Sequence, residues 1–391
     1  VAVRLAATST KRDGVWNSLT NPANGTKWGE IDKQAARGQI LWEANSDLTF
    51  LANIHGGISR GDPTPFKNVG THDPANVFAP CPVAAALLNP QDNPNCIDST
   101  GFNHQTNDWE DVTGGTRSSE KADTWGGGLK VVWDIGSVTV TSVSAYDYLK
   151  TTYLEDSDAT PNVAFEFSQG GQWDQWSQEL RVQSSADQQF RWIFGGYYFF
   201  EEGMYATVVR RTPAPFAPAG PGLFNIVPNT QVDQDNEVLS GYGQVEYDIQ
   251  DRLTATVGFR LTKETKKGWN ASSVRCVGST GGPPFCPDLH DSAFIGFTAT
   301  SLPGLFIIPQ ERLSNEDTEW GARFALDWQA TDDMLLYASI SRGFKAGGFS
   351  LAALQALTGL GSQPVTPETL WAYEVGVKSS WMDNTVEFNA S

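Results

Sequence analysis

The chain has 391 residues, a formal net charge of −18, and many glycines, tryptophans and phenylalanines (38, 14 and 21). Proteins that bind nucleic acid usually carry a basic face, so this acidity makes a nucleic-acid-binding protein unexpected. No run of about 18 apolar residues occurs, and the sequence therefore predicts no transmembrane helix. The plentiful glycine and aromatic residues favour strands and turns over helices.

From the N-terminus onward the sequence predicts about thirteen amphipathic strands, whose connections alternate between short and long. Short turns are expected at Glu43–Asp47, Asp134–Ser137, Ser184–Gln188, Ile249–Arg252, Gln329–Asp333 and Ser380–Asn384. Longer connections are expected at residues 12–34, 60–121, 151–171, 203–235, 267–315 and 347–365. Tight turns at one end of the strands and long loops at the other are typical of an outer-membrane β-barrel.

The clearest strands alternate between apolar and polar side chains. In residues 320–328, Trp320, Phe324 and Trp328 share one face, and Arg323 lies on the other. We expect strands of about 10–14 residues, in which two such tryptophans stand in aromatic girdles roughly 20 Å apart. A soluble sandwich or propeller would show the same alternation, because its aromatic residues would pack in a core. Strand length and the alternation of turn lengths favour the barrel.

The faces opposite the aromatic residues carry charges that suit an aqueous lumen. The residues expected to face this lumen are Arg37, Glu179, Arg181, Arg323, Asp327, Glu374 and Lys378. The predicted fold class is therefore all-β, an antiparallel transmembrane β-barrel. We expect its bulky apolar side chains to contact lipid and its charged side chains to border water.

Four cysteines form two local pairs, Cys81 with Cys96 and Cys276 with Cys286, and each pair falls within one expected long connection. The pairing predicts two disulfide bonds that close loops in an oxidising compartment. Free thiols are the alternative. A zinc site would require the two loops to converge, and no Cys-x-x-Cys spacing supports one. We expect neither a metal site nor a cofactor.

Two segments near the C-terminus form a distinctive pair. Residues 337–349 read Tyr-Ala-Ser-Ile-Ser-Arg-Gly-Phe-Lys-Ala-Gly-Gly-Phe, and residues 367–378 read Pro-Glu-Thr-Leu-Trp-Ala-Tyr-Glu-Val-Gly-Val-Lys. This pair resembles the barrel of TonB-dependent outer-membrane receptors, and residues 4–14 and 176–184 are similar to further segments of that family. Because the matches occur in order and reach both ends, the resemblance covers essentially the whole chain.

The resemblance implies a barrel of roughly 22 strands around a plug domain, of which residues 1–391 would supply about thirteen, from the second to the fourteenth. The chain begins and ends inside expected strands, so we expect it to be part of a longer protein. The plug domain, the N-terminal segment that engages TonB and the last strands would then lie outside it.

As the family resemblance implies, the whole protein would import a scarce nutrient, most commonly a ferric siderophore, across a Gram-negative outer membrane when TonB pulls on the plug. Its expected partners are the TonB complex, through the N-terminal region, and the lipid and lipopolysaccharide of that membrane. We expect no catalytic residues, because neither a Gly-x-Ser-x-Gly nor a His-Glu-x-x-His motif occurs. A passive porin and a secreted β-propeller or glycan-binding module are the alternatives.

Aromatic residues in the expected long connections are the candidates for contact with the solute, since small-ligand sites are largely apolar. They are Phe102, Trp109, Phe216, Phe224, Trp269 and Phe285. Packing between loops is the alternative role for them. The acidic run Glu155–Asp158 is expected to be a solvated loop tip, and the scattered histidines, among them His55, are expected to be solvated as well.

Overall fold

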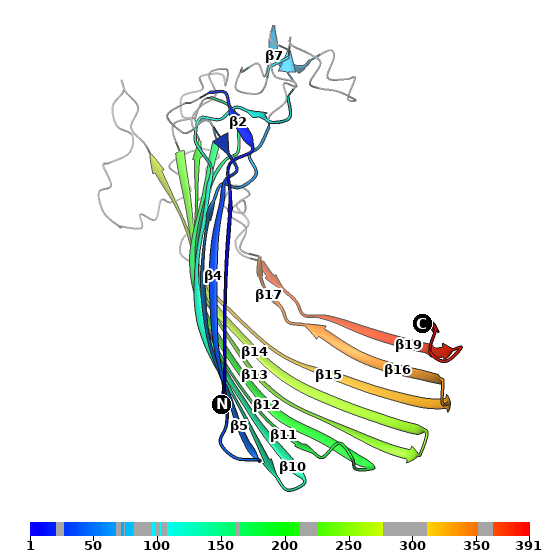
Figure 1. The fold of residues 1–391 in the computed structure, drawn as a ribbon. Helices are drawn as coiled ribbons and strands as arrows, with labels where there is room; N and C mark the ends of the chain where they lie inside the picture. The colour runs from blue at the N-terminus through cyan, green and yellow to red at the C-terminus, as the bar shows by residue number, and fades with distance from the viewer. Residues whose placement is uncertain are drawn as a thin grey trace.

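The computed structural model describes residues 1–20, 27–67, 72–73, 75–81, 96–97, 102, 108–161, 165–211, 226–276, 311–350 and 363–391. Its main feature is a single sheet of thirteen strands, in which each long strand pairs with the next one along the chain (Figure 1). All neighbouring strands of this sheet are antiparallel, and the sheet curves strongly along its length. The prediction of an all-β antiparallel fold is confirmed. In this part of the chain there is no helix long and apolar enough to cross a membrane.

The strands of the main sheet are named here with their bounds. They are β1 (Ala2–Arg12), β4 (Ile31–Glu43), β5 (Leu48–Gly61), β9 (Ser119–Ile135), β10 (Val138–Asp156), β11 (Phe165–Ser184), β12 (Phe190–Arg211), β13 (Ile226–Gln250), β14 (Leu253–Cys276), β15 (Glu311–Thr331), β16 (Met334–Lys345), β19 (Glu368–Trp381) and β20 (Val386–Ala390). Shorter strands form three small sheets within the long connections. They are β2 (Trp16–Ser18) with β3 (Lys27–Trp28) and β8 (Asp111–Val112), β6 (His72–Asp73) with β7 (Asn76–Pro80), and β17 (Gly348–Ser350) with β18 (Gln363–Val365).

The short turns lie where the sequence predicts them, because their backbone chemistry is local. Between β9 and β10 the chain reverses through Gly136, whose φ of +64° is the left-handed conformation that glycine adopts without steric cost. The turn between β19 and β20 contains Met382, Asp383 and Asn384, whose φ values are also positive, at 55°, 55° and 63°. The long connections leave the opposite ends of the strands. The sheet therefore has one rim of short turns and one rim of long connections (Figure 1).

Several strands are longer than the sequence pattern predicts. The five strands from β11 to β15 contain 20, 22, 25, 24 and 21 residues. Parts of the predicted long connections are therefore strand: residues 151–156, 165–171, 203–211, 226–235, 267–276 and 311–315. That prediction was wrong because alternation stops where both faces of a strand meet water, whereas backbone hydrogen bonding continues. About ten residues suffice to cross the hydrocarbon layer, so the rest of each strand extends beyond it.

The aromatic residues of the sheet do not pack in a core. Trp320, Phe324 and Trp328 of β15 are 38%, 44% and 51% exposed. Phe324 lies between Val257 and Ile340 of the neighbouring strands, so these side chains form one continuous apolar face. In the described part of the chain, most buried apolar residues belong to the connections instead of the sheet. An exposed apolar sheet face with no core beneath it is the surface that a barrel presents to lipid.

Placing a charge on this face should destabilise the fold. In the full-length protein folded into vesicles, we expect Phe324→Arg to lower the free energy of unfolding by about 2–4 kcal/mol, because a cation near the bilayer midplane is costly. Arg323→Gln, one position away on the other face, should change it by less than about 1 kcal/mol. Urea unfolding monitored by heat-modifiable migration measures both. Equal losses in the two variants would contradict the assignment of the faces.

Candidate solute path and loop platform

The pairing register sorts the side chains of the sheet onto two faces. Successive residues point to opposite sides, and directly paired residues share a side. The face opposite Trp320, Phe324 and Trp328, called here the polar face, carries all seven charged residues predicted to face a lumen. They are Arg37, Glu179, Arg181, Arg323, Asp327, Glu374 and Lys378. Their contact with an aqueous lumen stays a prediction.

His55 of β5 is the centre of a hydrogen-bonded cluster on the polar face. Its Nε2 lies 2.8 Å from Asp147 Oδ1 of β10, and its Nδ1 lies 3.2 Å from Asn53 Oδ1. Gln175 of β11 donates to the other carboxylate oxygen of Asp147 at 3.4 Å. The intervening strand carries Gly126, where a Cβ would come within 2.2 Å of Asp147 Oδ1. The glycine therefore lets side chains two strands apart reach each other.

A second polar-face cluster spans β11 to β14 in the same way. Tyr242 donates to Glu179 Oε1 at 2.5 Å and passes over Gly195, where a Cβ would lie 2.4 Å from the ring. Beside it, Arg260 Nη2 donates to Ser240 Oγ at 2.9 Å. A carboxylate that accepts from a phenol, beside a guanidinium that donates to hydroxyl groups, suits the wall of an aqueous channel and is costly in contact with lipid.

At the rim of the long connections, three of these connections pack into one unit (Figure 1, around β2). This loop platform comprises residues 12–20, 27–30, 108–118 and 156–161. Trp28 is 2% exposed and lies against Gly114, where a Cβ would come within 2.6 Å of the indole. Thr20 Oγ1 both donates to the carbonyl oxygen of Gly114 and accepts from its N–H, each at 2.9 Å. Only a residue without a side chain fits over this tryptophan.

An ion-pair network joins the platform to the ends of β4 and β5. The Asp62 side chain is 6% exposed and accepts hydrogen bonds from Arg117 Nη2 at 2.7 Å and from the N–H of Gly29 at 3.0 Å. Arg117 Nη2 also lies 3.0 Å from Glu30 Oε2. The hydrogen bond to Asp62 raises the pKa of Arg117, so the guanidinium remains charged. Without this cation, the Asp62 carboxylate would be buried and unneutralised.

Asp156 ends β10 and is buried in the platform, at 4% exposed. Its carboxylate accepts hydrogen bonds from the backbone N–H of Thr116 at 3.1 Å and of Ala159 at 2.9 Å. Burial raises the pKa of Asp156 to about 6, and the nearby charge of Asp158 acts in the same direction. The prediction that this acidic run is a solvated loop tip was wrong for Asp156, because a distant connection folds over it.

The raised pKa makes the stability of the platform depend on pH. Because the pKa in the folded state, about 6, is above the ordinary value of 3.8, the platform is most stable when Asp156 is protonated, and stability falls as pH rises through 6. We expect Asp156→Asn, which has no titrating carboxyl group, to remove this dependence on pH. Hydrogen exchange of platform amides, corrected for intrinsic rates, measures it. Stability that rises between pH 5 and 7.5 in the unaltered protein would contradict this account.

The predicted ligand-contacting aromatic residues fall in different places. Trp109 is 65% exposed in the turn before β8, at the edge of the platform. Phe102 belongs to no strand. Trp269 lies within β14, paired with Asp233 and Arg312 and on the side of the apolar face, so its assignment to a loop at a pore mouth was wrong. The other three lie outside the described residues: Phe216, Phe224 and Phe285.

Sequence reasoning missed two polar-face residues. His55 was expected to be solvated, yet it bonds to Asp147, and its place in the alternation of β5 is the signal that could have assigned it to this face. Trp173 of β11 lies across Gly203 of β12, where a Cβ would come within 2.3 Å of the indole. A glycine directly opposite a tryptophan indicates a ring packed across the neighbouring strand. A glycine opposite a tryptophan can be recognised only when the pairing register of β11 and β12 is known.

Cys81 and Cys96 form a disulfide bond with their Cα atoms 5.8 Å apart, and both residues are buried. The bond closes part of the connection between β5 and β9, beside the bridge that pairs His72 with Ile97. Cys286 lies outside the described residues, so the bond between Cys276 and Cys286 stays a prediction.

The curved sheet, its two faces and its two rims agree with a comparison of the sequence with family models. The model of the TonB-dependent receptor-like β-barrel matches residues 42–391. The chain belongs to this family, and its sheet is part of a β-barrel. The predicted family and fold are confirmed, and the family's members are outer-membrane proteins of Gram-negative bacteria.

Solved structures share the fold at low sequence identity. The ferric yersiniabactin uptake receptor of Yersinia pestis matches with a TM-score of 0.65 and 13% identity, over 97% of this chain and 48% of the receptor. The ferric-catecholate import receptor of Escherichia coli, in its closed form, gives 0.60 and 12%, over 99% and 53%. The siderophore receptor PiuA of Acinetobacter baumannii gives 0.57 and 12%, over 99% and 52%. The chain thus spans about half the length of each of these structures.

Proposed function

We propose that the protein containing this chain is a TonB-dependent transporter of the Gram-negative outer membrane, which imports a scarce nutrient, most readily a ferric siderophore. Family membership supports transport. The observation that carries the proposal is the pairing of an exposed apolar face with a hydrogen-bonded polar face on one sheet. Two structural neighbours are described as receptors for ferric yersiniabactin and for ferric catecholates, which identifies the substrate class to test first.

In this proposal the polar face is the wall of the lumen. Its charged side chains hold a plug domain and guide the solute, while the clusters around His55 and Glu179 keep the wall rigid. Residues 1–391 supply part of the barrel, and the plug and the TonB-engaging segment belong to other parts of the protein. The energy for opening comes from TonB pulling on the plug, so the chain contributes binding and gating without any covalent step.

The loop platform supports a fixed entrance on the outer rim. Because the platform joins three connections, it holds Trp109 in an exposed position beside the path of the solute. Exposed aromatic rings can stack on the apolar parts of an iron chelate. We include Phe102, Phe216, Phe224 and Phe285 in the same proposed mouth, and the bond between Cys276 and Cys286 as a constraint on it.

Transport can be tested in cells that lack the gene and are complemented with the full-length protein. We expect iron-limited cells to take up a radiolabelled ferric siderophore only when both this protein and TonB are present. Uptake that persists without TonB would instead show a passive channel. Failure to take up any ferric chelate, together with uptake of another solute, would reject the siderophore as substrate.

The role of Trp109 has its own test. We expect Trp109→Ala to weaken ferric-siderophore binding to whole cells about five- to tenfold, since a truncated aromatic contact typically costs more than 1 kcal/mol. The control is Trp328→Ala, which removes an equally large side chain from the apolar face and should leave the affinity unchanged. If the affinity for Trp109→Ala equals that of the unaltered protein, Trp109 does not belong to the mouth.

A further inference from the structure

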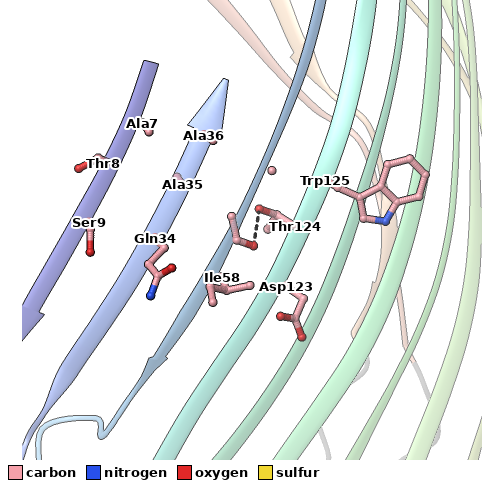
Figure 2. A pocket seen from close by; sticks show the side chains of 12 residues that line it. Ala7, Thr8, Ser9, Gln34, Ala35, Ala36, Ile58, Asp123, Thr124 and Trp125 are labelled. Atoms are coloured by element: carbon pink, nitrogen blue, oxygen red, sulfur yellow. Dashed lines mark hydrogen bonds between the residues drawn. The ribbon is translucent and has the colours of Figure 1, made fainter. Parts of the chain in front are cut away.

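A groove runs along the apolar face over the first strands of the sheet. It consists of two adjoining hollows of about 640 Å³ and 740 Å³, which share Ala7, Ala36 and Gly56. Figure 2 shows the first hollow, with residues of β1 and β4 on one side and Ile58 and Trp125 of β5 and β9 on the other. The shared residues carry at most one side-chain carbon, so the larger side chains stand around a low floor.

The groove opens toward lipid and away from the polar face. A Cβ at Gly38, in the second hollow, would lie 3.5 Å from Leu5 and 3.7 Å from Ile54. These two neighbours are 81% and 69% exposed, and Trp125 is 53% exposed at the wall of the first hollow. In a membrane this surface contacts acyl chains. Tryptophan on a barrel surface marks the headgroup level.

Cations stand just beyond Trp125, toward the rim of the long connections. The register brings Lys11, Asp32, Arg60 and Lys121 into one row across β1, β4, β5 and β9, on the side of the apolar face. Lys150 of β10 is the diagonal neighbour of Lys121 on the same side. Lys121 lies four positions from Trp125, which is about 13 Å along the strand.

Two like charges oppose each other directly in this row. Arg60 and Lys121 are register partners, an arrangement that destabilises a sheet unless an anion lies nearby. Asp123 forms an ion pair with Arg60 and is also the register partner of Lys150, and Asp32 lies 3.0 Å from Lys11. The side chains of Lys121 and Lys150 are exposed. The four cations therefore exceed the two carboxylates, within a chain whose net charge is −18.

Farther from β1, the same side of the sheet carries negative charge at the level of Trp125. Continuing the row of Trp125 and Tyr148, the register passes through Asp174, Glu202 and Asp235 of β11, β12 and β13. These carboxylates lie on the same side of the sheet as the lysines. From β11 to β13 this side of the sheet is therefore acidic at the level of Trp125, whereas the basic cluster lies on β1, β5, β9 and β10, next to the apolar hollow.

We propose that the groove and the basic cluster together bind one phosphorylated glycolipid of the outer leaflet. Its phosphate lies between Arg60, Lys121 and Lys150, and an acyl chain occupies the groove below, beside Trp125. Phosphate held by clustered cations at the headgroup level, above a hydrocarbon chain, matches both parts of the site. The site faces the membrane, so the inference is separate from the solute proposed above.

The test is binding of bisphosphorylated lipid A to the full-length protein in detergent, measured by native mass spectrometry. We expect Lys121→Ala/Lys150→Ala to weaken binding at least about tenfold, because each basic residue near an anionic membrane surface strengthens binding by about fivefold. Ala36→Phe, which fills the floor of the groove, should weaken binding by itself. The matched control is Lys263→Ala/Lys267→Ala, two exposed lysines on the same side of β14, which should bind as the unaltered protein does.

Each outcome decides for or against the site. Lipid A with its phosphates removed should bind weakly, and inorganic phosphate alone should not compete. Unchanged binding in the Lys121→Ala/Lys150→Ala variant, or equal binding of the phosphate-free lipid, would overturn the proposal, as would full competition by inorganic phosphate. Heat-modifiable migration verifies that each variant is folded. Siderophore uptake should remain unchanged in the lysine variant, so this result is independent of the test of transport.

Discussion

The absence of water in the hydrocarbon layer is the constraint on which this structure depends. A strand there cannot leave its N–H and C=O groups unpaired, so each must bond to a neighbouring strand. The chain meets this requirement by pairing every long strand with the next one in sequence, from β1 to β20. The same pairing gives the sheet an apolar face and a polar face, because successive side chains point to opposite sides.

Glycine allows the polar face to form contacts across more than one strand. At Gly126 and Gly195, the missing side chain leaves room for Asp147 and Tyr242. In the long connections outside the membrane, buried polar groups must find hydrogen-bond partners without the regular pairing of a sheet. There the platform uses Arg117 to neutralise a carboxylate and backbone N–H groups to receive Asp156. Both solutions satisfy buried polar groups before any solute binds.

Sequence patterns succeeded where the physics is local and failed where it is not. Gly136 marks a turn because its backbone needs a positive φ, and Phe324 marks a lipid-facing side because alternation is visible within one strand. Trp269 was misplaced because alternation ends where a strand leaves the membrane, although its pairing continues. The burial of Asp156 was not predicted, because the connection that covers it lies about forty residues earlier in the chain. The sequence of a polar loop does not indicate which other loop it will contact.

The sequence by itself determined the fold class, the family, the short turns and the side of the sheet on which the seven charged residues of the polar face lie. Side-chain alternation and turn conformation depend only on neighbouring residues, so they can be read along the chain. The tertiary structure decided which residues meet: His55 and Asp147 are 92 positions apart, and Asp62 and Arg117 are 55 apart. Strand register sets such contacts, and it also brings residues of β1, β4, β5 and β9 together around one groove, since register belongs to pairs of strands.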